Sequence, residues 1–103
     1  MGQKVIWATS ALEDLEAAAE FIHRDSPADA ASFVTRTLQA ACSLSDLPER
    51  GRRIPEIRDK AIREVYIQSY RLIYRIEKNS VSILALIHGR RDLTAAWSAR
   101  ERK

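Results

Sequence analysis

The chain has little of several residue types that common kinds of protein site require. Cys42 is the single cysteine among 103 residues, so neither a disulfide within the chain nor a cysteine-based zinc site can form, and we expect Cys42 to be a small buried helical residue. No apolar run reaches the roughly 20 residues of a membrane-spanning helix, and Met1 is not followed by the hydrophobic stretch of a signal peptide. These absences predict a cytoplasmic protein with no metal, no cofactor and no membrane contact.

Basic side chains are few in the first half of the chain, and acidic side chains are few in the second. Residues 1–49 carry three basic and eight acidic side chains, whereas residues 50–103 carry fourteen basic and six acidic ones. A cationic half of this kind favours an anionic partner, either a nucleic acid or an acidic protein. The length and the apolar fraction of 46% fit one folded domain, residues 1–103.

Three short apolar runs between residues 62 and 93 predict a β-meander, around which the rest of the chain is organised. Residues 70–76 alternate with period two, so that the two faces of one strand can be assigned. Tyr70, Leu72, Tyr74 and Ile76 fall on one face, and Arg71, Ile73 and Arg75 fall on the other. Residues 81–87 are apolar on both faces, which is typical of a central strand buried on both sides. A polar turn at residues 78–80 joins these two strands.

A short strand and a helix are predicted at the start of the chain. Residues 4–7 are expected to join the sheet that the meander forms. Ser10 and Glu13 have the spacing of a capping box, which satisfies free N–H groups at a helix start. We therefore expect a helix over residues 11–24, with Leu12 in its apolar stripe.

A second helix follows after a short break. Ser26 can cap it, and Pro27 fits its first position because the N–H that proline lacks would have no partner there. Its apolar stripe includes Leu38 and extends to about residue 45. The two helices therefore form an antiparallel hairpin that the sheet covers.

The remaining segments are short. Residues 46–61 contain two prolines and one glycine and predict a loop that Leu47, Ile54 and Ile57 pin to the domain. Residues 93–100 predict a short helix. In order, these elements predict an α+β fold: a short N-terminal strand, an antiparallel helical hairpin packed on an antiparallel sheet completed by the C-terminal three-stranded meander, and a short C-terminal helix.

A series of short motifs runs along nearly the whole chain in a specific order. They are Ile6-Trp7, Ala11-x-x-Asp14-Leu15, Ser26-Pro27-x-x-Ala30-x-x-Phe33, Leu47-Pro48-x-x-Gly51-Arg52-x-x-Pro55-Glu56, Arg63-Glu64, Tyr70-Arg71-Leu72-Ile73-Tyr74 and His88-Gly89-Arg90-Arg91-Asp92-Leu93. In this order and spacing the chain resembles the RelE/ParE toxins of bacterial type II toxin–antitoxin systems, and its ParE-like members more closely.

The resemblance implies a toxin that a cognate antitoxin binds and neutralises, with an oligomer formed through the toxin–antitoxin complex. It leaves the target open, because members similar to RelE cut messenger RNA on the ribosome whereas members similar to ParE act on DNA gyrase. We favour a ParE-like growth inhibitor that is not an enzyme. The alternatives are a ribosome-dependent, metal-independent endoribonuclease and a degenerate member that only binds antitoxin.

The nuclease alternative needs groups that move protons and cations that stabilise a charged phosphorus centre. The candidates are Arg63, His88 and Arg90, helped by a carboxylate such as Glu49 or Glu56. Arg63 and His88 are expected on neighbouring strands of the meander, where they can share a concave face. Against this, a histidine at a strand end is more often structural than catalytic.

The partner-binding alternative uses the basic residues of the second half. No aromatic residue alternates with the arginines of residues 50–63, and the meander tyrosines can be absorbed as packing residues, so a base-stacking platform is not evident. Docking of a protein is therefore preferred, and Trp97 is either packed on the sheet or an exposed anchor. The candidate partner-binding residues are Arg50, Arg52, Arg53, Arg71, Arg90, Arg91 and Trp97.

Overall fold

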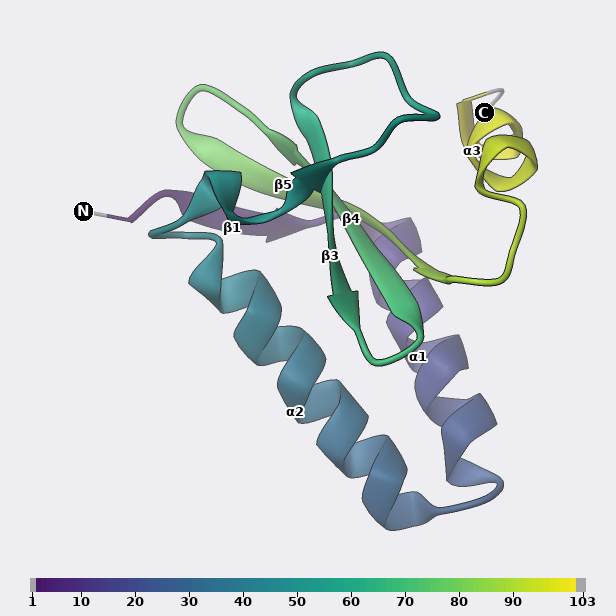
Figure 1. The fold of residues 1–103 in the computed structure, drawn as a ribbon. Helices are drawn as coiled ribbons and strands as arrows, with labels where there is room; N and C mark the ends of the chain where they lie inside the picture. The colour runs from purple at the N-terminus through teal and green to yellow at the C-terminus, as the bar shows by residue number, and fades with distance from the viewer. Residues whose placement is uncertain (1, 102–103) are drawn as a thin grey trace.

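The computed structural model describes residues 2–101, which form an α+β fold with three α-helices and a five-stranded mixed sheet (Figure 1). The strand order is β1-β5-β4-β3-β2, with β1 parallel to β5 and the other neighbours antiparallel. The predicted fold class and the meander are therefore confirmed. The elements are β1 (Lys4–Trp7), α1 (Thr9–His23), α2 (Pro27–Ser43), a 3-10 turn (Pro48–Arg50), β2 (Arg52–Arg53), β3 (Ile62–Ile67), β4 (Tyr70–Ile76), β5 (Ser80–His88) and α3 (Leu93–Glu101).

The two long helices form the predicted hairpin, which lies on one face of the sheet (Figure 1). The Ser26 cap is confirmed, because its Oγ accepts the N–H of Asp29 at 3.1 Å. The Ser10 capping box is wrong: α1 follows Ala8 directly, and no side chain caps it. The reason is that Ala8 donates its N–H to the carbonyl of Ile83. This hydrogen bond to the sheet determines where α1 begins, which is directly after Ala8.

The main core lies between the hairpin and the sheet. Its largest fully buried side chains include Phe33 from α2 and Tyr74 from β4. Three expectations about this layer are wrong, since Leu12 and Leu38 are about half exposed and Cys42 is also exposed. Both leucines stand at the flank of their helix, where the apolar stripe is wider than the surface that the sheet covers.

A second, smaller core lies on the opposite face of the sheet. Helix α3 and the segment after β2 cover this face, and Trp97 packs there while remaining partly exposed. Ile54 and Ile57 pin the segment as predicted, but Leu47 is 60% exposed and does not. The predicted loop also contains a strand, β2, that the sequence did not reveal because it has only two residues.

A β-bulge in β5 distributes its apolar side chains between the two cores. Ile73 pairs with Ala85 and the next residue, Tyr74, pairs with Ile83, so that Leu84 is the extra residue. Ile83 lies in the main core, whereas Leu84 and Ala85 belong to the smaller one. The prediction of a central strand apolar on both faces is confirmed. No helix within residues 2–101 combines the length and apolar character that crossing a membrane demands.

Candidate functional site

The three candidate nuclease residues do not form one constellation. Strand β4 separates β3 from β5, so Arg63 and His88 are not on neighbouring strands, and this expectation is wrong. Arg63 pairs with Tyr74, and His88 pairs with Tyr70. These partners are four residues apart along β4, which corresponds to about 13 Å at the rise of a strand.

Each of these two residues is held by contacts within the fold. Arg63 donates to the carbonyl of Gly51 at 2.9 Å and lies 3.8 Å from a carboxylate oxygen of Glu49. The ring of His88 meets Tyr70 edge-on, with centroids 5.1 Å apart, and its Nδ1 accepts the N–H of Arg90 at 3.1 Å. His88 therefore fastens the turn that follows β5, while the side chains of Arg90 and Arg91 are exposed on that turn.

A different cluster on the sheet face opposite the hairpin brings together residues from three strands. Glu64 on β3 has no exposed side-chain surface. It accepts the Nε–H of Arg52 at 2.7 Å and the Nε–H of Arg71 at 2.6 Å, one on each carboxylate oxygen. These hydrogen bonds raise the pKa of both arginines, so each keeps its charge at any physiological pH.

Tyr66 lies on the same face of β3 as Glu64 and is 51% exposed. The guanidinium carbon of Arg52 is 5.6 Å from the centroid of its ring, and that of Arg71 is 5.9 Å away, which are cation–π distances. Glu64 thus fixes two cations beside an exposed aromatic ring.

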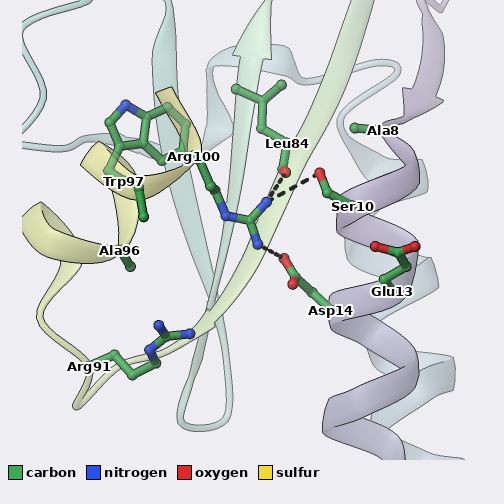
Figure 2. Close-up of a pocket in the computed structure, with 10 residues that line it drawn as sticks. Ala8, Ser10, Glu13, Asp14, Leu84, Arg91, Ala96, Trp97 and Arg100 are labelled. Carbon is green, nitrogen blue, oxygen red and sulfur yellow. Dashed lines mark hydrogen bonds and ion pairs between the residues drawn. The ribbon is translucent and has the colours of Figure 1, made fainter. Parts of the chain in front are cut away.

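The turn after β5 passes beside this ring. Gly89 donates its N–H to the carbonyl of Ser69 at 2.7 Å, and a Cβ placed on Gly89 would lie 3.6 Å from the Tyr66 ring. Arg90 and Arg91 follow Gly89 on this exposed turn, and Arg91 lines a cavity beside α1 together with Asp14 (Figure 2). We call the group formed by the exposed Arg52 and Tyr66 and by the buried Arg71 beside them the Tyr66 surface.

Sequence reasoning missed the central residue of this surface. The expectation that Tyr66 is a packing residue is wrong, whereas Tyr74 is buried and Tyr70 is partly buried as expected. The signal was present in the alternation of β3, which places Tyr66 on the face of Glu64 and away from Val65 and Ile67, both of which belong to the main core.

The other candidate partner-binding residues lie elsewhere. Arg50 donates to the hydroxyl of Ser43 at the end of α2, and Arg53 is exposed on β2 in register with Arg63. Trp97 is on α3, against the smaller core. From the candidate set, the structure therefore places Arg52 and Arg71 beside Tyr66, puts Arg90 and Arg91 on the turn after β5, and disperses the remaining three.

The chemistry of the Tyr66 surface suits binding of an anionic or aromatic group. Its cations are permanently charged, and its buried carboxylate already accepts two strong hydrogen bonds. Within residues 2–101, no group of three or more His, Cys, Asp or Glu side chains is placed to hold a metal ion.

Comparison with known proteins agrees with this fold. Residues 5–93 match the family model described as the ParE toxin of the type II toxin-antitoxin system, parDE. The toxin RelE2 of Caulobacter vibrioides is 34% identical over 89 residues, which are 85% of this chain and 97% of that protein.

Two solved structures share the arrangement of helices and strands. The chromosomal ParDE system of P. aeruginosa gives a TM-score of 0.69 at 17% identity, covering 84% of this chain and 95% of that one. The RelBE2 toxin–antitoxin complex of Mycobacterium tuberculosis gives a TM-score of 0.57 at 26% identity, covering 85% and 99%. With the family model spanning most of the sequence, the chain belongs to the RelE/ParE family of toxins from type II toxin–antitoxin systems.

Proposed function

We propose that the chain inhibits growth by binding DNA gyrase through the Tyr66 surface, and that a cognate antitoxin neutralises it. The observation that carries this proposal is the exposed Tyr66 ring between two arginines that a buried Glu64 holds in place. Tyrosine and arginine are enriched at the centres of protein interfaces, and fixing them before binding reduces the entropy lost on association.

The geometry around this surface favours contact over bond cleavage. RNA cleavage needs a free proton acceptor and a proton donor within hydrogen-bond reach of one phosphate. Glu64 is occupied by Arg52 and Arg71, and Nδ1 of His88 is occupied by the backbone of Arg90. The match of residues 5–93 to the ParE family model also supports this choice.

A supercoiling assay with purified gyrase tests the proposal. The wild-type chain should inhibit supercoiling, and Tyr66→Ala should weaken inhibition about thirtyfold, the cost of losing a hot-spot aromatic of about 2 kcal/mol. His88→Ala should retain inhibition, because His88 contacts Tyr70 and the backbone N–H of Arg90, and neither belongs to the Tyr66 surface. Unimpaired supercoiling at saturating amounts of folded wild-type protein would refute the gyrase target.

A ribosome-dependent endoribonuclease is the second candidate, and one observation favours it. An exposed tyrosine flanked by guanidinium groups can stack a base and hold a phosphate, and a relative that is 34% identical bears the name RelE2. The test is to map 5′ ends of messages on translating ribosomes. New ends that depend on Arg63, His88 or Arg90 would support the nuclease, whereas antitoxin binding without effect on either target would identify a degenerate member.

A further inference from the structure

A cavity of about 480 Å³ lies on the sheet face opposite the hairpin, between helix α3 and the segment that joins β2 to β3. Figure 1 shows this segment extending from the sheet toward α3. The volume is in the range of sites that hold small ligands. None of the lining residues belongs to the Tyr66 surface, so binding of gyrase there gives this cavity no role.

The floor of the cavity is apolar. Ile57, Ile62 and Leu84 line it, and all three belong to the smaller core or pack against it. Trp97 adds a partly exposed indole ring to the wall. Aromatic rings pack favourably against an indole, so a flat aromatic group fits these walls better than a sugar or a polar chain.

Helix α3 brings two hydroxyl groups to the same wall. Thr94 and Ser98 precede and follow Trp97 at spacings of three residues and one residue, and the two hydroxyls are four residues apart, so they share a helix face. The last turn of α3 is fixed, because Arg100 donates to a carbonyl of β5 at 3.2 Å and forms an ion pair with Asp14 (Figure 2). This wall is therefore in place before a ligand binds.

The charged residues that line the cavity leave one positive charge unpaired. Asp59 forms an ion pair with Arg75, and Glu56 lies 4.0 Å from a guanidinium nitrogen of Arg71. Arg58 is exposed and forms no ion pair within residues 2–101. A guanidinium can bind a carboxylate through two parallel hydrogen bonds. A carboxylate also carries the single charge that one arginine balances, whereas a phosphate monoester carries about two.

We propose that this cavity binds a small aromatic carboxylate, with its ring against Trp97 and its carboxylate on Arg58. The hydroxyls of Thr94 and Ser98 are exposed and can donate hydrogen bonds to the ligand. Because such a ligand contacts α3 and the segment after β2 at once, its binding stabilises α3 on the sheet. This site depends on neither gyrase nor the antitoxin, and either proposal can fail alone.

The test is NMR titration of the full chain with naphthoate. Saturable shifts with a Kd below about 1 mM are expected. The indole N–H signal of Trp97 should move and that of Trp7 should not, because Trp7 packs against the main core on the other face of the sheet. Arg58→Ala should weaken binding about tenfold through loss of the charged hydrogen bonds. Lys60→Ala is the matched control, since it removes the same charge from the same segment at a position outside the cavity lining, and its affinity should equal that of the wild type.

A second variant tests the location of the ligand. Ser98 is exposed on α3, so Ser98→Trp should fold, and its larger side chain should fill the cavity and abolish binding. The amide spectrum without ligand checks the fold of each variant. Four results would overturn the proposal: naphthylmethylamine binds as tightly as naphthoate, Arg58→Ala and Lys60→Ala have equal affinities, Ser98→Trp keeps the affinity of the wild type, or no saturable shift occurs up to about 10 mM naphthoate.

Discussion

Glu64 is an acidic residue in the middle of a strand, and the structure explains why it is stable there. Burial of a carboxylate is costly unless charged partners satisfy it, and Arg52 and Arg71 each donate to one of its oxygens. Arg71 is itself almost fully buried, and a second carboxylate, that of Glu56, lies farther away at 4.0 Å. The ion pair between Glu64 and Arg71 therefore stabilises the fold and also holds Arg71 beside Tyr66.

Replacing Glu64 should show how much its ion pair with Arg71 contributes to stability. Glu64→Ala leaves the buried guanidinium of Arg71 without its main partner, and we expect the free energy of unfolding to fall by about 3 kcal/mol. Urea denaturation measures this loss, and Arg52→Ala is the control: Arg52 is largely exposed and Glu64 keeps its bond to Arg71 in that variant, so the loss should be smaller. Equal losses for the two variants would contradict the explanation.

Tyr74 connects β4 to the segment before β2. Its hydroxyl accepts the N–H of Gly51 at 2.9 Å and donates to the carbonyl of Pro48 at 2.6 Å. Position 51 must be glycine for this contact, since a Cβ there would lie 2.5 Å from the hydroxyl oxygen. Burial raises the pKa of Tyr74, because the phenolate would lose its hydration.

Tyr74→Phe should lower the free energy of unfolding by about 1–3 kcal/mol, because the Gly51 N–H and Pro48 carbonyl lose their partner. The pH dependence follows from the raised pKa. The unfolded state loses the phenolic proton first as the pH rises above about 10, so stability should fall there in the wild type. Thermal unfolding from pH 8 to 11 should show a shallower fall for Tyr74→Phe, and identical slopes would contradict the assignment.

At the scale of elements, local sequence patterns correctly predicted the features that neighbouring residues determine. They failed for the features that depend on pairing within the sheet. Ser26 and Pro27 start α2 through their own side chains, so the sequence located that helix start correctly. The start of α1 depends on the bond from Ala8 to Ile83, 75 residues away in the chain, which periodicity cannot reveal. The bulge at Leu84 is likewise set by pairing between β4 and β5. The exposure of Tyr66, in contrast, could have been predicted from the alternation of β3.

The two serines near the helix starts provide a matched test of this distinction. Ser26→Ala removes the acceptor of the Asp29 N–H and should lower the free energy of unfolding by about 1 kcal/mol. Ser10→Ala removes no cap, because α1 begins without one, and should change stability by less than about 0.5 kcal/mol. Chemical denaturation of both variants measures the difference, and a larger loss for Ser10→Ala would restore the capping box.

At the scale of the whole molecule, the acidic first half and the basic second half of the sequence lie in different layers of the fold. The helical hairpin carries exposed acidic residues, including Glu13, Glu16 and Glu20 on α1. Tyr66 and the arginines beside it lie on the sheet face opposite the hairpin, and the exposed Arg90 and Arg91 follow β5. An acidic partner is therefore attracted to one side of the molecule and repelled from the other.

This layering predicts how association depends on salt. The association rate constant with the cognate antitoxin should fall as ionic strength rises, since screening shortens the reach of the cationic side. Exchanging Arg90 and Arg91 for glutamate should reduce that rate about tenfold at low salt and remove most of its salt dependence. The same exchange at Lys60 and Lys78 alters the net charge equally, but these lysines precede β3 and β5 and are remote from the turn after β5, so its effect should be smaller. Stopped-flow measurements over a range of salt concentrations would distinguish the variants. Equal reductions in both would mean that total charge, and not its position on the turn after β5, governs the encounter.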